Sequence, residues 1–175
     1  MKSKRGRTAR LPGRKGLDIP PFSRWVPIAD RRSLPGIQER GLYIVGRFDR
    51  CPRGAAKPLH RNVIYIGETH GPRMSIRRRL DYFARAAIHG RAKHSGGWRC
   101  FRTFGADPPD LHVAALPIIE PDQQRLEALI FAIERTLIAA YADRWGTMPV
   151  CNVSAGKGSE IGFEKTEPPA YVVAA

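Results

Sequence analysis

Charged side chains at the borders of two predicted helices are the first groups in this sequence that could do chemistry. In the first helix, which we expect from Met74 to about Gly90, apolar residues recur with helical spacing at Ile76, Leu80, Phe83 and Ala87. Helical rotation places Arg79 beside this apolar stripe, where it could reach the exposed end of a neighbouring sheet and hold anionic oxygens. An ordinary solvated cationic face accounts for Arg77 and Arg78, which point farther from the stripe.

Two glutamates occupy a similar border on a second helix. This helix follows Pro121-Asp122 and ends before Gly146, with a buried stripe predicted at Leu126, Leu129, Ile130, Ile133 and Leu137. Glu134 lies beside that stripe, and Glu127 lies two turns earlier on nearly the same edge. Either carboxylate could complete the shell of a Mg²⁺ ion that keeps several of its waters. Helical spacing alone does not distinguish the two.

Two tyrosines lie in strands that must place them near these charges. Residues 41–46 and 63–66 have the branched and aromatic content of strands, and the Pro- and Gly-containing segment 47–62 predicts an antiparallel hairpin with a long loop. Tyr43 and Tyr65 then fall on adjacent strands near the same register. Because a free phenol has a pKa of about 10, a tyrosine here must pass its proton on or only orient a water molecule.

The remaining elements are less sharply marked. Residues 111–118 predict a third strand, whereas Gly96 and Gly97 predict a break in the chain followed by a short extended piece from Trp98 to Phe104. These elements predict an α/β fold built on a small, mainly antiparallel three-stranded sheet flanked by helices. We expect a basic disordered arm at residues 1–21, one folded domain at residues 22–155 and a C-terminal tail at residues 156–175.

The charge of the chain favours nucleic acid as its partner. Thirty Lys and Arg against sixteen Asp and Glu give a net charge of +14 and a pI near 10.5, which is typical of proteins that bind polyphosphate. The first seventeen residues contain seven cations and no acid, and could follow phosphates without reading bases; the cations are Lys2, Lys4, Arg5, Arg7, Arg10, Arg14 and Lys15. We expect no membrane partner and a cytoplasmic location. The three cysteines are far apart, which favours reduced thiols over a zinc site.

The order of these motifs resembles the GIY-YIG nuclease family. The tripeptides at 41–43 (Gly-Leu-Tyr) and 65–67 (Tyr-Ile-Gly) are similar to the pair that names the family. The segment 79–83 (Arg-Leu-Asp-Tyr-Phe) looks like its helical arginine, and 134–138 (Glu-Arg-Thr-Leu-Ile) looks like its glutamate helix. The segment 149–152 (Pro-Val-Cys-Asn) resembles its terminal proline and asparagine.

The resemblance implies a metal-dependent endonuclease that hydrolyses phosphodiester bonds in DNA. The catalytic residues that it implies are Tyr43, Tyr65, Arg79, His94 and Glu134, with Glu134 as the ligand of a divalent metal, Mg²⁺ by its preference for oxygen. Tyr43 is implied as the base or the water-orienting group, with Tyr65 supporting it. Structural roles at the site are implied for Gly41, Gly67 and Asn152, and Arg77 and Arg78 join the basic arm as nucleic-acid contacts.

The sequence departs from the family pattern in two places, and rival functions remain. The loop 47–62 and the segment 68–75 are longer than usual, which surface turns tolerate. Phe83 occupies the place where one subgroup has a histidine, while His94 resembles the later histidine of another. A non-catalytic DNA- or RNA-binding module with the same fold is the main alternative, but such modules usually lose the arginine or the glutamate. A basic RNA-binding protein of the ribosomal type would explain the charge alone.

Overall fold

The computed structural model describes residues 19–152 except residues 70, 107 and 109. In chain order the elements are β1 (Val26–Pro27), the 3-10 helix η1 (Ile28–Ser33), β2 (Gly41–Arg47), β3 (Val63–Glu68), α1 (Ile76–His89), α2 (Ser95–Phe104), β4 (Leu111–Pro117) and α3 (Gln123–Trp145). The predicted hairpin of β2 and β3, the strand at residues 111–118 and the two long helices are therefore confirmed.

Within the described residues the strands form one antiparallel sheet of four strands, in the order β1-β4-β2-β3. The α/β class and the small antiparallel sheet are confirmed, but the predicted number of three strands is too low. The missed strand β1 has two residues, too few for a period-two pattern to be visible. Because β2 lies between β4 and β3, β3 forms one edge of the sheet.

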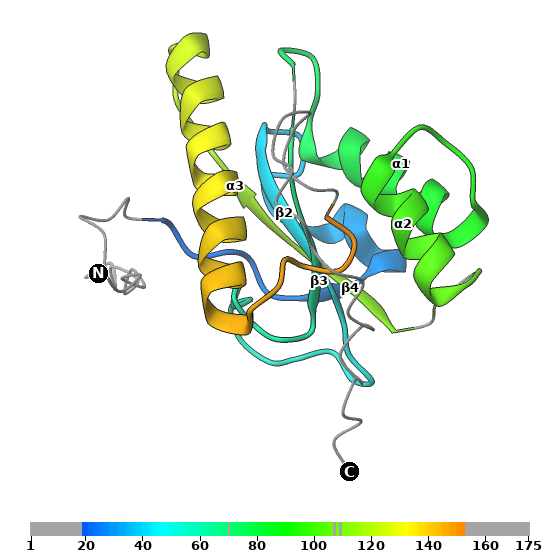
Figure 1. Ribbon diagram of the computed structural model, residues 1–175. Coiled ribbons are helices and arrows are strands. Elements are labelled where there is room, and N and C mark those ends of the chain that lie inside the picture. Colours follow the sequence, from blue (N-terminus) through cyan, green and yellow to red (C-terminus); the bar gives the residue numbers. More distant parts are fainter. Residues whose placement is uncertain (1–18, 70, 107, 109, 153–175) are drawn as a thin grey trace, which may run out of the picture.

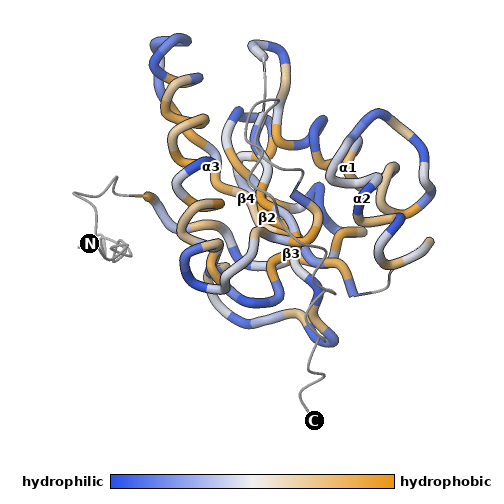
Figure 2. Tube along the Cα trace, in the orientation of Figure 1, coloured by the Kyte–Doolittle hydropathy of each residue, from blue (hydrophilic) through white to orange (hydrophobic). Residues whose placement is uncertain are grey.

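Helices cover both faces of this sheet (Figure 1), with α3 on one side and α1 and α2 on the other. Alternate residues of β2 supply the two cores: Leu42 and Ile44 pack with α3, whereas Tyr43 and Val45 pack with α1. The strands are apolar along most of their length, and polar residues follow the outer sides of the helices (Figure 2). Burying one such aliphatic side chain stabilises the fold by roughly 1.5–3 kcal/mol.

The ends of α1 and α3 are set by local capping. The Ser75 side chain accepts a hydrogen bond from the Arg78 N–H at the start of α1. Asp122 accepts from two backbone N–H groups at the start of α3, both at 2.9 Å. Each helix ends at a glycine in the left-handed conformation, Gly90 and Gly146. Caps of this kind can be read from the sequence because they depend on near neighbours in the chain.

The prediction for residues 96–104 is wrong. Gly96 and Gly97 do not break the chain, and Trp98–Phe104 is not extended, because the whole segment lies in α2. A Cβ at Gly97 would lie 2.7 Å from both the Ala86 side chain and the Phe83 carbonyl oxygen on α1. The glycine that disfavours an isolated helix is thus what allows α2 to approach α1, so packing overrides propensity.

The predicted ends of the domain fall partly outside the described residues. Residues 1–18 of the basic arm and all of the predicted tail at 156–175 are not described. Ile19 and Phe22 are 7% and 3% exposed and belong to the core on the α3 side. Packed chain is therefore present two residues before position 21, where we had expected the arm to end. Along the described chain, no helix is both long enough and apolar enough to span a membrane.

Candidate active site

Tyr43 and Tyr65 face the same side of the sheet from neighbouring strands. Tyr43 lies opposite Gly67 in the register of β2 and β3, and the centroids of the two tyrosine rings are 5.8 Å apart. A Cβ at Gly67 would lie 2.8 Å from Cζ of Tyr43 and would also collide with the Tyr65 ring. Glycine at this position therefore leaves the space that the two phenols occupy.

His94 joins these phenols from the N-cap of α2. Its Nε2 lies 2.8 Å from the hydroxyl oxygen of Tyr43, and its Nδ1 accepts a hydrogen bond from the Gly97 N–H at 3.1 Å. Since Nδ1 is an acceptor, the neutral ring carries its proton on Nε2 and donates it to Tyr43. In this tautomer His94 orients the Tyr43 hydroxyl and does not receive its proton.

Burial determines the ionisation of all three rings. It is the main reason that the pKa of His94 falls to about 3, with Arg79 as the second cause. Burial also raises the pKa of Tyr65 to about 12 and that of Tyr43 well above its usual value of 10. At neutral pH the histidine is uncharged and both phenols keep their protons.

The two tyrosines differ in how the surrounding groups act on them. Arg79 lowers the pKa of both phenols, but for Tyr43 its effect is smaller than that of the neighbouring Tyr65. The Tyr65 hydroxyl raises the pKa of Tyr43, and the Tyr43 hydroxyl lowers that of Tyr65. His94 and Tyr65 thus both lie beside Tyr43.

Phe83 fills the space beside these rings. Its ring centroid lies 5.2 Å from those of both Tyr65 and His94, and the side chain is fully buried. A phenylalanine at this position of α1 supplies an apolar wall. The imidazole that hydrogen-bonds to Tyr43 comes instead from His94 on α2.

Arg79 is the cation of the site. It lies in the first turn of α1, where its N–H donates to the Ser75 carbonyl oxygen at 3.0 Å, and it is partly buried. Its charge acts on the pKa of four groups: Tyr43, Tyr65, His94 and Glu134. Within the described chain its buried Nε has no hydrogen-bond partner. A buried guanidinium nitrogen of this kind is unfavourable until an acceptor arrives.

The neighbouring arginines differ from Arg79 in their surroundings. Arg77 and Arg78 are exposed, and Nε of Arg78 donates to the Tyr82 hydroxyl at 3.2 Å. They are oriented outward, as the helical pattern had suggested. The predicted nucleic-acid contacts of the arm, Lys2 to Lys15, lie outside the described residues.

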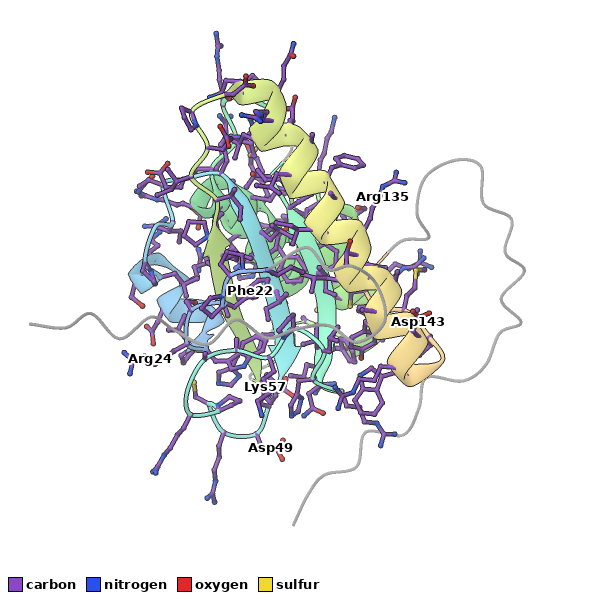
Figure 3. The ribbon with its side chains drawn as sticks, turned by 90° about the vertical axis from the view of Figure 1, so that its left-hand side faces the viewer. Phe22, Arg24, Asp49, Lys57, Arg135 and Asp143 are labelled. Carbon is purple, nitrogen blue, oxygen red and sulfur yellow. The ribbon has the colours of Figure 1, made fainter. Side chains whose placement is uncertain are left out.

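Glu134 brings a carboxyl from α3 to the same group of residues. Burial raises its pKa to about 7, Glu68 raises it further, and Arg79 and Arg135 oppose this rise. The Arg135 side chain itself points away from α3 at the outside of the molecule (Figure 3). Glu127, which spacing could not separate from Glu134, forms an ion pair with Arg40 at 3.1 Å. The structure therefore separates the two glutamates: only Glu134 faces Arg79.

Glu68 is a residue of the site that the sequence analysis missed. It is the last residue of β3, lies opposite Leu42, and is partly buried. Its charge acts on Glu134 and on Tyr65. The available signal was its position directly after Tyr65-Ile-Gly67 at a strand end, where a charged side chain lies at the rim of a sheet.

Asn152 and Gly41 lie at the margins of the site. The Asn152 Oδ1 accepts from the Ile66 N–H at 3.0 Å, and Nδ2 donates to the Ile66 carbonyl oxygen at 2.8 Å. The amide thus pairs with edge strand β3 between Tyr65 and Gly67. Gly41 begins β2 with a φ of 154°, and a Cβ there would collide with the Leu116 carbonyl oxygen. Its backbone N–H donates to the Thr69 hydroxyl at 2.9 Å.

The carboxyls suit a cation that needs few protein ligands. Among the described residues, no group of three or more His, Cys, Asp and Glu side chains could enclose a metal ion. Glu68 nevertheless raises the pKa of the partly buried Glu134, as a second carboxylate close by does. Mg²⁺ binds one or two carboxylates and keeps its waters, so these residues fit it.

Comparisons with protein-family models, with curated proteins and with solved structures find no match to this chain.

Proposed function

We propose that this chain is a metal-dependent endonuclease that hydrolyses phosphodiester bonds in DNA, with an active site of the GIY-YIG type. The observation that carries the proposal is the convergence of five chemical groups from separate segments of the chain: Tyr43, Tyr65, Arg79, His94 and Glu134. The guanidinium can stabilise phosphoryl charge, the carboxylate can hold a cation, and the phenols can orient a water, which are roles that hydrolysis of a phosphate ester uses. The net charge of +14 supports a polyanionic substrate.

In this proposal Arg79 binds the phosphoryl oxygens at the scissile bond. Its buried Nε has no partner in the described chain, so a phosphate oxygen would satisfy it and gain a charge-assisted hydrogen bond. Charge develops on these oxygens in the transition state, and a positioned donor stabilises that charge most strongly where water is excluded. The half-buried setting of Arg79 is favourable for such an effect.

The tyrosines would orient the attacking water rather than deprotonate it. Both phenols are protonated at neutral pH, and His94 donates to Tyr43 rather than accepting from it. Tyr43 is held between His94 and Tyr65, so its hydroxyl oxygen has a fixed direction. A fixed hydroxyl restricts the water to one line of approach to phosphorus, which lowers the entropic part of the barrier.

Glu134 would hold the divalent cation, with Glu68 beside it. When bound, such a cation would supply positive charge to the phosphate and lower the pKa of water, so that the attacking water could release its proton to solvent as the P–O bond to the leaving oxygen breaks. The Glu134 carboxyl, whose pKa is about 7, must be ionised to act as a ligand. Cleavage should therefore increase with pH up to about neutrality. We place the enzyme in the cytoplasm, where its free cysteines remain reduced.

The test is cleavage of supercoiled plasmid and branched DNA by the purified protein, with and without Mg²⁺. Glu134→Gln should abolish cleavage and leave DNA binding nearly unchanged. Glu127→Gln is the matched control, because it makes the same substitution on the same helix at a residue that pairs with Arg40. Equal rates for the wild type and Glu134→Gln on every substrate, or no Mg²⁺-dependent cleavage at all, would refute the proposal.

A further inference from the structure

An open cavity of about 460 Å³ lies where the end of α1 meets α2. It is lined by Ile88, His89, Arg91, Phe101 and Ala106. Its volume is within the range of small-molecule sites, which combine apolar walls with a few polar groups. Here Ile88 and Phe101 provide the apolar walls, and the guanidinium of Arg91 provides a positive charge. None of these residues belongs to the candidate active site.

Two aromatic rings form a shelf beside this cavity. The ring of Phe101 packs against the backbone at Gly90, where a Cβ would lie 3.0 Å from it. The Trp98 ring meets Phe101 edge-on, with centroids 5.8 Å apart and planes at 82°. Trp98 is 41% exposed, although a large apolar ring is normally more buried. Because the two planes are nearly perpendicular, the exposed ring of Trp98 is the stacking surface for a nucleobase, which has a flat π face, and Phe101 supports it from the side.

The surface around the shelf is rich in positive charge, which favours an anionic ligand. Residues 76–104, from the start of α1 to the end of α2, contain eight Lys and Arg and one acid, Asp81. That acid is already paired with Arg31 at 2.8 Å. Arg91 lines the cavity, Arg102 directly follows Phe101 in the chain, and both are exposed. An aromatic surface next to exposed cations fits a nucleotide, whose base stacks while its phosphate binds an arginine.

The cavity and Arg79 lie toward opposite ends of α1. His94 contacts Phe83, Gly97 approaches Ala86, and Phe101 approaches Gly90, so α2 runs alongside α1 in the same direction. Arg79 and His89 are ten residues apart on α1, which corresponds to about 15 Å along the helix. A strand of duplex advances about 3.4 Å per nucleotide. A strand bound at Arg79 would reach the cavity, which His89 lines, about four nucleotides away.

We propose that the Trp98–Phe101 shelf and the adjoining cavity bind one unpaired nucleotide of the substrate. In a duplex each base is already stacked between its neighbours, so only an unpaired base is free to stack on a protein ring. The substrate class is therefore DNA with a single-stranded flank or branch a few nucleotides from the cleaved phosphate. This inference rests on the proposed function, because it identifies the substrate of that same site.

The experiment measures binding, not cleavage. The full-length chain carrying Glu134→Gln is titrated into two labelled oligonucleotides of the same duplex sequence, one blunt and one with a four-nucleotide single-stranded flank, and anisotropy gives the affinity. Trp98→Ala should weaken binding to the flanked duplex by about five- to hundredfold, the effect of losing one stacked base. Binding to the blunt duplex should change less than twofold. Phe131→Ala, at an aromatic residue of similar exposure on α3, should change neither.

A second pair of variants tests the phosphate contact. Arg91→Ala should also weaken binding to the flanked duplex more than to the blunt duplex, whereas Arg125→Ala, an exposed arginine on α3, should affect both alike. Both Trp98 and Arg91 are exposed, so their loss should leave the fold intact, which circular dichroism will show. Equal losses on the two duplexes, no loss on either, or no binding to any DNA would overturn the inference. Flank-selective binding through Trp98 by a wild-type chain that does not cleave would refute the proposed function and leave this inference standing.

Discussion

The pairing of Asn152 with β3 allows a quantitative prediction. Asn152 is 7% exposed, and its amide makes one acceptor and one donor contact with Ile66, at 3.0 and 2.8 Å. In Asn152→Asp the acceptor contact can persist, but the donor is replaced by an oxygen that faces the Ile66 carbonyl oxygen. A buried carbonyl that loses its donor is destabilised by about 1–3 kcal/mol. Burial of a carboxylate adds to this loss.

We therefore expect Asn152→Asp to lower the free energy of unfolding by about 2–4 kcal/mol and Tm by roughly 5–15 °C. Urea denaturation followed by circular dichroism gives the first quantity, and calorimetry gives the second. Asn62→Asp, the same change at a partly exposed position in the loop before β3, should alter stability by less than about 0.5 kcal/mol.

The result that would refute this reasoning is a stability of Asn152→Asp within about 0.5 kcal/mol of the wild type at pH 7. The amide would then contribute little to holding β3. A large loss of stability in the Asn62→Asp control would be equally damaging, because it would show that the effect of new charge is general and not specific to the pairing with Ile66.

Three further predictions concern charge. Arg79→Ala should reduce kcat for plasmid cleavage on the order of a hundredfold or more if Arg79 stabilises transition-state charge; equal losses in Arg79→Ala and Arg78→Ala would reduce Arg79 to part of a solvated face. Folding raises the pKa of Glu134 from 4.5 to about 7. The proton on Glu134 therefore adds to the free energy of unfolding in full below pH 4.5, and this contribution is lost as the pH rises through 7. Glu134→Gln should flatten the fall in Tm across this window, and an unchanged pH profile would contradict the shift. Deleting residues 1–17 should flatten the dependence of log affinity on log salt by several units, at about 0.9 per phosphate contact; an unchanged slope would assign those contacts to the folded surface.

Much of the fold could be predicted because the relevant signals are local. The long helices carry both their apolar spacing and their caps within a few residues, as with Ser75 at the start of α1 and Asp122 at the start of α3. The helix α2 could not be predicted in this way. Gly96 and Gly97 are poor helix formers, and they are present in α2 because the Tyr65 ring and α1 approach the helix backbone there. That requirement is set by residues distant in the sequence.

In the candidate site, too, the features set by local spacing could be predicted, and those set by long-range packing could not. The border positions of Arg79 and Glu134 follow from helical spacing, but the spacing did not separate Glu134 from Glu127. The two glutamates differ because Glu127 pairs with Arg40, the residue just before β2. The contact between His94 and Tyr43, 51 residues apart, and the presence of Glu68 next to Glu134 likewise depend on how the sheet and helices pack.

Two features of the described site are unfavourable for the chain by itself. The buried Nε of Arg79 has no acceptor within the described chain, and Glu134 binds a proton near neutrality because burial and Glu68 disfavour its charge. A phosphate oxygen would remove the first penalty, and a cation would remove the second. Both ligands are parts of a metal-bound nucleic acid backbone, so one substrate would relieve both. Replacing either residue with a neutral one should accordingly preserve or increase stability in the absence of DNA while abolishing turnover, which is the pattern of a site that is selected for binding and not for folding.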